Sequence, residues 1–487
     1  MKQINKSIIT AVVLLMAMLT SCNKFLDVQP KTQIPEELLF NSEAGFKDAL
    51  TGVYILAKHA DAYGKALTFA DIENIISGWD ITTNSFEQQI GLFNYSDARV
   101  ITRMNAIFSQ QYKVIAHINA ILGNIDSKKE VFRTKGMYEL IKGECLSFRA
   151  YLHFDLMRLY GPSPVDPGKG NQLAYVTEYS NQLNAHIGFS EYKEKIFKDL
   201  SEGKQLLKSV DPILNFSMSE LRYPGPTRRF NPADLFFAYR YLRMNYYAST
   251  ALEARAHLWY GDKELALTAA REVIEAKNAD GTDKFPLATS AVYASKNYPL
   301  TTEQIFGMYH YNLNDIFSNN FGNATYRKGT TANTITTRLY GNTGTDVRES
   351  SLWSVITLGN GSNNYVMRKY LPLAESSTDA DTDYKQIPML RTSEMYLIAA
   401  ETAPFADGLT YFKQFRTIRN IGQLAAPADQ AALYSEIIKE YRKEFYGEGQ
   451  AYYAYKRINA PKSVILFCPT SATVNYIMPM PTVEVIK

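Results

Sequence analysis

The stretch 246–274 constrains the fold more than any other, because it contains two helical faces separated by a glycine turn. The first face repeats every three or four residues and consists of Tyr247, Ala251, Ala254 and Leu258. The second face follows Gly261 and consists of Ala266, Ala269, Ala270, Val273 and Ile274. Small residues on both faces let two helix backbones approach closely, so this stretch predicts a tight helical hairpin.

A shorter echo of this hairpin lies upstream. Segments 149–152 and 255–258 share an Arg-Ala-x-Leu core, and each run ends in Tyr-Gly, at 160–161 and 260–261. A recurring pair of helices with glycine at the turn is typical of tetratricopeptide-like repeats. We therefore predict a helical-repeat scaffold, with an ordinary helix pair in a mixed domain as the alternative.

Helical periodicity covers most of the chain, which predicts a mostly α fold. Asn41 and Ser42 can cap the first helix, and Gly161 with Pro162 ends the upstream hairpin. Besides the central hairpin, which we expect to begin near Asp234, the predicted helices are 36–59, 104–124, 135–160, 190–208, 389–402, 409–420 and 430–446.

The segment 278–388 has a different character. Thr, Asn, Gly and Tyr dominate it, and helical periodicity disappears apart from two short strand-like runs at 305–309 and 365–370. An irregular segment of this length is too long for a passive connection. Because loops on a rigid scaffold often carry binding residues, we expect this insert to contribute to a ligand site.

Composition narrows the classes of function. The chain has 487 residues, of which 46% are hydrophobic and 21% are charged, so it can bury a substantial core. Its formal charge is only +3, and loss of residues 1–21 would remove Lys2 and Lys6 and leave +1. This near-neutral balance argues against a nucleic-acid partner.

The N-terminus resembles a bacterial lipoprotein signal. A basic start at Lys2 and Lys6 is followed by an apolar run at 8–19 that is too short to span a bilayer. Leu-Thr-Ser then precedes Cys22, as in a lipobox. We predict that residues 1–21 are a signal peptide, that Cys22 is lipidated and that 22–35 is an extended leader, so that the lipid is the membrane anchor. A plain secretory signal with a chance cysteine is the alternative.

Several motifs, taken in order, resemble the SusD/RagB family of outer-membrane lipoproteins from Bacteroidetes. They begin with Phe-Leu-Asp at 25–27 behind Cys22 and continue with Lys-Gly-Glu at 142–144 and Arg-Leu-Tyr-Gly at 158–161. Further matches are the run 390–401, Gly-Glu-Gly at 447–449, Lys-Arg at 456–457 and Met-Pro-Met-Pro at 478–481. Each motif is weak alone, but together they cover nearly the whole chain.

The resemblance implies one SusD-like domain over 36–487, with an N-terminal helical part at 36–277, the loop-rich insert at 278–388 and a C-terminal helical part at 389–487. It also implies four tetratricopeptide-like helix pairs and a lipid-anchored protein at the outer membrane that faces the exterior. Members of the family pair with a SusC-like, TonB-dependent transporter and pass oligosaccharides, sometimes peptides, to it. The resemblance implies no catalysis.

The motifs of common enzymes and metal sites do not occur in the sequence. Its six histidines form no His-Glu-x-x-His motif, and no Gly-x-Ser-x-Gly or P-loop is present. Of these histidines, His153 and His257 fall on predicted helices and are expected to be structural. Asp379, Asp381 and Asp383 could hold calcium, but a solvated loop is the preferred interpretation, so we predict neither a metal nor a cofactor. Cys145 lies on an apolar helix face and is expected to be buried, with a bond to Cys468 left open.

Sugar binding needs flat aromatic faces together with amide and carboxylate groups. Two stretches supply both kinds of side chain, one in the loop after residue 78 and one in the insert. The predicted ligand-binding residues are Trp79, Asp80, Asn84, Tyr309, Tyr311, Asn320, Tyr326 and Trp353. Core packing is the alternative for any one of these aromatic residues, and Trp259 is expected to be core.

These patterns predict a surface lipoprotein that captures an oligosaccharide for a transporter. A peptide-capturing lipoprotein of the same fold is one alternative, and it should have a deeper groove with backbone donors. A pure assembly scaffold is the other, and it should lack an aromatic platform.

Overall fold

The computed structural model describes residues 36–180, 182–371, 385–481 and 484. The predicted signal peptide, Cys22 and the leader therefore lie outside the described residues, as do Asp379, Asp381 and Asp383.

The central hairpin forms as predicted, from α10 (Tyr246–Tyr260) and α11 (Lys263–Ile274). Gly261 ends α10 with a φ of +83°, a left-handed conformation that glycine adopts without strain. Ala251 and Ala254 of α10 and Ala270 of α11 are fully buried. The helix starts later than the sequence suggested, because Asn245 rather than Asp234 accepts the capping hydrogen bond, from Ala248 N–H.

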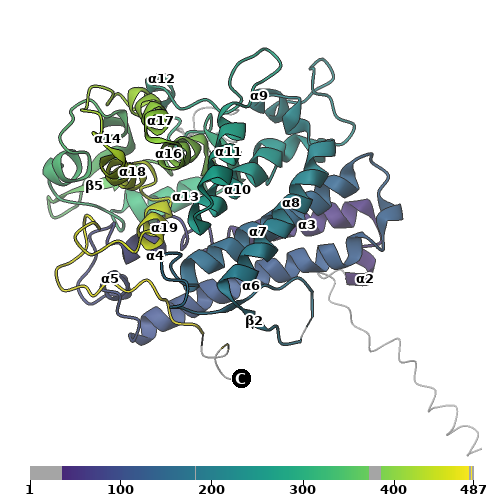
Figure 1. Cartoon of the computed structure of the whole chain (residues 1–487), viewed down its shortest axis with the longest axis horizontal. Coiled ribbons are helices and arrows are strands. Elements are labelled where there is room, and N and C mark those ends of the chain that lie inside the picture. Colours follow the sequence, from purple (N-terminus) through teal and green to yellow (C-terminus); the bar gives the residue numbers. More distant parts are fainter. Residues whose placement is uncertain (1–35, 181, 372–384, 482–483, 485–487) are drawn as a thin grey trace, which may run out of the picture.

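The N-terminal part is a stack of long helices in which α7 packs against both α6 and α8 (Figure 1). The predicted cap at Ser42 is present, since its side chain accepts a hydrogen bond from Gly45 N–H. This part consists of α2 (Glu36–Leu39), α3 (Glu43–Ala57), α4 (Asp71–Ile75), α5 (Phe86–Gly91), α6 (Ala98–Ile125), the 3₁₀ turn η2 (Lys129–Val131), α7 (Met137–Tyr160), β1 (Leu173–Ala174), β2 (His186–Ile187) and α8 (Phe189–Val210).

Short turns lead from α8 to the central hairpin. They are η3 (Pro212–Leu214), α9 (Met218–Arg222) and η4 (Leu235–Tyr241). Arg240 at the end of η4 is fully buried and pairs with both Glu144 and Asp211. The pair with Glu144 fixes η4 against α7. The position of η4 is important because this segment forms one wall of the candidate site.

The insert contains more regular structure than expected. After α12 (Ser290–Ala294) it holds β3 (Gln304–Tyr309), α13 (Leu313–Phe317), the π-helical segments η5 (Ser318–Gly322) and η6 (Thr334–Leu339), α14 (Val347–Leu352), β4 (Trp353–Thr357) and β5 (Asn363–Met367). The two predicted strands correspond to β3 and β5. Their antiparallel partners, β6 (Gln386–Arg391) and β4, were not predicted.

The C-terminal helices pack beside the central hairpin, with α16 against both α10 and α11 (Figure 1). They are α16 (Thr392–Thr402), α17 (Phe405–Ile418), α18 (Gln430–Glu444) and α19 (Gln450–Arg457). Residues 389–391, predicted as the start of a helix, belong instead to β6, where Met308 pairs with Ile387 and Gly307 with Pro388.

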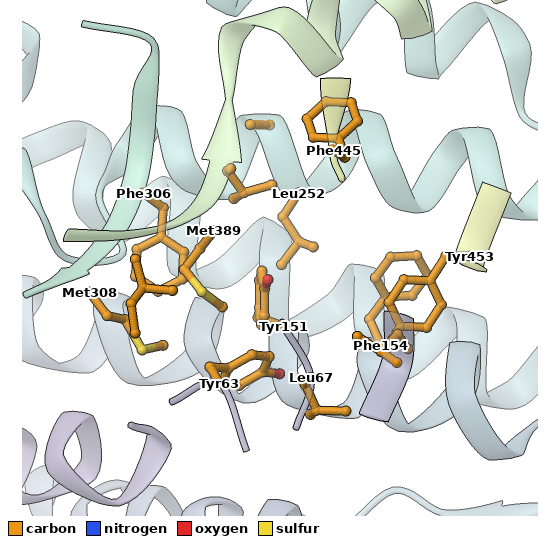
Figure 2. Packing of buried hydrophobic residues seen from close by; sticks show 14 of the residues in the cluster. Tyr63, Leu67, Tyr151, Phe154, Leu252, Phe306, Met308, Met389, Phe445 and Tyr453 are labelled. Atoms are coloured by element: carbon orange, nitrogen blue, oxygen red, sulfur yellow. The ribbon is translucent and has the colours of Figure 1, made fainter. Parts of the chain in front are cut away.

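Apolar side chains of the small β3–β6 sheet pack against the helices. Figure 2 shows Phe306 and Met308 of β3 and Met389 of β6 gathered near Tyr151 of α7. The Phe306 and Tyr151 rings meet edge to face, with centroids 5.6 Å apart. This contact holds the end of β3 in place, and the candidate site lies at that end.

Both cysteines in the described residues are free. Cys145 is buried, as predicted, and so are Trp259 and His153. Burial lowers the pKa of His153 to about 3, so its ring is neutral and bonded within the core. Within the part of the chain that the structure describes, no helix is both long and apolar enough to cross a bilayer.

Candidate functional site

Trp79 does not form the exposed platform that the sequence suggested. Its side chain is only 2% exposed, and its indole N–H donates to the Phe69 carbonyl at 2.6 Å. Its ring lies against Phe321 at 5.6 Å and Tyr446 at 5.1 Å. Because the insert and the turn after α18 close over this ring, it has no free face on which a sugar could stack.

Three more predicted residues belong to the same buried cluster. The rings of Tyr326 and Trp353 lie 5.9 Å and 6.3 Å from Trp79. Asn320 is also buried, and its amide donates to the Ile316 carbonyl. The structure therefore brings these four residues together, but as core that joins the insert to the first loop, which overturns the expectation that they are exposed.

Asp80 and Asn84 remain at the surface. The Asp80 carboxylate accepts a hydrogen bond from Gly329 N–H and pairs with Lys328, so it also anchors the insert. Asn84 has a φ of +61°, a turn conformation that asparagine tolerates, and its carbonyl accepts from Arg99. Tyr311 is 72% exposed, with the Lys385 ammonium 5.1 Å from the centre of its ring.

A groove of about 420 Å³ lies between α3, the η4 segment and the end of β3. Tyr309 is the predicted site residue that lines it. The lining residues are Thr51, Tyr54, Ile55, Lys58, Tyr239, Tyr241, Leu242, Arg243, Gly307, Met308 and Tyr309.

Three elements position this groove by their local geometry. Thr51 and Ile55 of α3 and Lys58, which caps the C-terminal end of that helix, recur at helical spacing and so share one face. The N–H of Gly307 on β3 donates to the Leu242 carbonyl at 2.9 Å, which ties the strand to the chain that follows η4. The Lys58 ammonium donates to the Tyr309 carbonyl at 2.8 Å and so ties α3 to the same strand.

Tyrosines dominate the walls. Tyr239 is 46% exposed, Tyr241 and Tyr309 are half-buried, and Tyr54 lies at the base with its hydroxyl bonded to Glu144. Burial together with the Glu144 charge raises the pKa of Tyr54 well above its ordinary value, so this hydroxyl stays protonated. The groove can therefore offer ring faces to an apolar ligand surface and hydroxyls to polar groups.

Two cations also line the groove. The Arg243 guanidinium lies over the rings of Phe236 and Tyr239, at 4.4 Å and 4.8 Å, and donates to the Thr51 hydroxyl at 3.2 Å. Burial first, and the Arg243 charge second, lower the pKa of Lys58. None of the lining residues is Asp, Glu, His or Cys, and the polar side chains of the lining are Thr51, the tyrosines, Lys58 and Arg243.

Sequence reasoning missed Tyr239, Tyr241 and Arg243. The signal that could have found them is the run 236–247, in which six tyrosines and phenylalanines are interspersed with two arginines at the start of the central hairpin. The sequence predicts that the hairpin helix begins at this run, near Asp234. The 3₁₀ conformation in this run, which directs these side chains towards α3 and β3, depends on the buried ion pairs of Arg240.

Comparison with known proteins places this fold in a defined class, that of SusD-like proteins. Residues 24–217 match a family model described as "Starch-binding associating with outer membrane", and residues 301–480 match one described as "SusD family". The chain belongs to the SusD/RagB family.

A curated relative, SusD-like protein P25 of Formosa agariphila, is 27% identical over 156 residues. The match spans 30% of this chain and 28% of that relative's length.

Solved structures share the fold over nearly the whole chain. A SusD homolog from Bacteroides thetaiotaomicron superposes with a TM-score of 0.67 at 15% identity, covering 93% of this chain and 97% of that one. A SusD superfamily protein from the same organism gives a TM-score of 0.64 at 19% identity, covering 91% and 97%. A structure named as a laminarin-binding SusD-like protein gives 0.62 at 15% identity, also covering 91% and 97%.

Proposed function

We propose that this chain is a surface-exposed lipoprotein that captures an oligosaccharide and delivers it to a partner TonB-dependent, SusC-like transporter. The observation that carries the proposal is the open, tyrosine-lined groove on a SusD-type scaffold. The match to a family model described as starch-binding and the fold shared with a laminarin-binding protein support a carbohydrate ligand.

The groove is the proposed sugar site. The faces of Tyr239, Tyr241 and Tyr309 would cover the apolar C–H side of a pyranose, while the tyrosine hydroxyls and Thr51 would bond its hydroxyl groups. Tyr309 was also among the ligand-binding residues predicted from the sequence. Tyr311, two residues beyond Tyr309 and exposed, is retained as a residue for a longer ligand, whereas Asp80 and Asn84 stay untested predictions outside the groove lining.

The proposed location is the outer membrane, with acyl chains on Cys22 as the anchor and the groove facing the exterior. The lipobox-like sequence before Cys22 supports this location. We propose a binding role without catalysis, because the groove lining holds no carboxylate, imidazole or thiol.

Titration of the full chain, solubilised in detergent, against a panel of oligosaccharides tests the capture step. We expect Tyr239→Ala and Tyr309→Ala each to weaken binding by about 1–3 kcal/mol, which is the range for losing one stacked aromatic contact. Tyr179→Ala is the matched control, because Tyr179 is an exposed tyrosine outside the groove. Loss of affinity in the control but not in the groove variants would place the sugar elsewhere.

Copurification tests the delivery step. A tagged full chain extracted in mild detergent should bring down a TonB-dependent β-barrel from its native membrane. Recovery of the lipoprotein alone under conditions that preserve other outer-membrane complexes would contradict the proposed partnership.

A further inference from the structure

We propose that the groove recognises an anionic sugar residue, with Arg243 as the main partner of its negative charge and Lys58 as the second. This inference rests on the proposed function, since it specifies the class of oligosaccharide that the groove would take.

The first observation is the charge of the groove. Its lining contains two cations, Arg243 and Lys58, and no acidic side chain. Glu144 and Asp211 are paired with Arg240, and Asp234 with Lys47, while Asp315, which acts on His310, does not line the groove. Among the ion pairs of the described residues, none includes Arg243 or Lys58. The groove is therefore positively charged, and within the described part of the chain its lining holds no counter-charge.

The second observation is the state of Arg243. Its side chain is largely buried, at 9% residue exposure, yet its Nη1 has no hydrogen-bond partner. Its Nη2 donates to Thr51, a neutral hydroxyl. Guanidinium groups in such surroundings are normally bonded to a carboxylate or a carbonyl, because an unpaired buried donor is unfavourable. An incoming anion would supply the missing acceptor.

The third observation concerns the other cations near this end of the groove. The printed hydrogen bond of the Lys58 ammonium goes to the Tyr309 carbonyl, which leaves capacity for further acceptors on a group with three donors. Burial, followed by the Lys58 charge, lowers the pKa of His310, the residue after Tyr309. Burial is the main cause of both lowered pKa values; a positive neighbour adds to it in each case, Arg243 for Lys58 and Lys58 for His310, while Asp315 opposes the effect at His310.

These groups fit an acidic sugar better than a simple ion or a neutral glycan. A planar guanidinium matches the two oxygens of a carboxylate or sulfate ester. Tyr239 lies directly over the Arg243 guanidinium, with its ring 4.8 Å away, and is also one of the exposed walls. A pyranose that stacks on this ring would therefore hold an acidic substituent close to the arginine.

The experiment compares ligands that differ only in charge. The full chain in detergent is titrated with tetramers of galacturonate, glucuronate and mannuronate, with the methyl esters of each, with a sulfated galactan oligosaccharide and with a neutral glucan tetramer. At least one acidic oligosaccharide should bind about tenfold or more tightly than its neutral counterpart at low salt, and the difference should shrink as salt is added. The uronate and sulfate arms show which acid supplies the charge.

Two variants connect the preference to the groove. Arg243→Gln should abolish the preference for the acidic ligand, and Arg243→Lys should restore part of it. Because Arg243 packs among aromatic rings, Lys58→Gln serves as a second variant at a half-exposed position, and it should reduce the preference by a few-fold. Lys204→Gln is the control, since Lys204 lies outside the groove.

Each outcome has a defined meaning. Equal affinity for acid and ester in every pair, or a preference that survives both variants, overturns the inference. If neutral glucan binds and the acidic ligands do not, the inference fails while the proposed sugar capture stands. If no sugar binds, and peptides with a free carboxyl terminus bind in an Arg243-dependent way, both proposals fail in favour of peptide capture.

Discussion

At the scale of single residues, Trp79 shows how local sequence can misplace a side chain. It is followed by Asp80 and lies close to a Thr-Thr-Asn-Ser turn, and polar neighbours of this kind usually indicate an exposed residue. Its actual neighbours, Phe321, Trp353 and Tyr446, come from far along the chain. Nothing within a short window of sequence carries that information, so only the tertiary contacts decide that this ring is core.

Trp79→Ala should therefore act on stability and not on ligand affinity. Removing a buried tryptophan leaves a cavity among packed rings, and we expect a loss of about 3–5 kcal/mol in the free energy of unfolding. Denaturant unfolding measures this loss, and titration of the folded variant should give unchanged affinity for the best oligosaccharide. A variant of normal stability with weakened binding would return Trp79 to the ligand site.

Of the groove residues, the sequence predicted some and missed others. Tyr309 was predicted because it belongs to a stretch of the insert in which aromatic and amide side chains occur together. Arg243 and Tyr239 were not, because their role arises only where η4, α3 and β3 meet. The sequence identified aromatic and polar residue types correctly, but it could not say which of them share a surface.

At the scale of elements, the long helices were predictable and the short strands were not. The faces of α10 and α11 repeat over several turns, and Gly261 marks the break between them. By contrast, β6 contains only a short apolar run, and α16 begins at the next residue, Thr392. Short apolar runs of this kind do not distinguish strand from helix, and Pro388 was the one available sign against a helix.

Contacts between elements also make the free energy of unfolding depend on pH. Glu73 of α4 is buried, and its carboxylate accepts hydrogen bonds from Gly447 N–H and Gly449 N–H in the turn between α18 and α19. Burial nevertheless raises its pKa from 4.5 to about 8, against the opposing effect of these two donors. The folded protein thus holds a proton on Glu73 that the unfolded chain releases near pH 4.5.

The free energy of unfolding should therefore fall, as far as Glu73 contributes, when the pH rises from about 5 to about 8. The contribution is fully present below pH 4.5 and is lost as pH rises through the folded-state pKa. Glu73→Gln keeps an acceptor for the two N–H groups and removes the titration, so its stability relative to the parent should increase over this range by about 1.4 kcal/mol for each unit of pKa shift realised. Denaturant unfolding at pH 5, 6.5 and 8 measures the difference, and parallel curves would rule out the raised pKa.

At the scale of the whole molecule, a buried ion network joins the insert to the C-terminal helices. The carboxylate of Glu444 at the end of α18 accepts hydrogen bonds from Arg391 of β6, Arg419 after α17 and Arg348 of α14. Glu303, just before β3, also pairs with Arg391 and Arg419. Sequence periodicity predicts none of these pairs, because charged residues at helix ends are usually assigned to solvent.

Replacing Glu444 should destabilise the molecule as a whole. Its three arginine partners hold the pKa of the carboxyl well below its ordinary value, so it is ionised in the folded protein. In Glu444→Gln the arginines would remain buried with one counter-charge removed, and we expect a loss of about 3–5 kcal/mol in the free energy of unfolding. Lys439→Ala is the control, because its pair with Glu436 is solvent-exposed and worth about 0–1 kcal/mol.

Since β6 and β3 form one sheet and β3 carries Tyr309, the folded fraction of Glu444→Gln should also bind oligosaccharide more weakly. A variant as stable as the control, with unchanged affinity, would mean that the network supports neither the fold nor the groove.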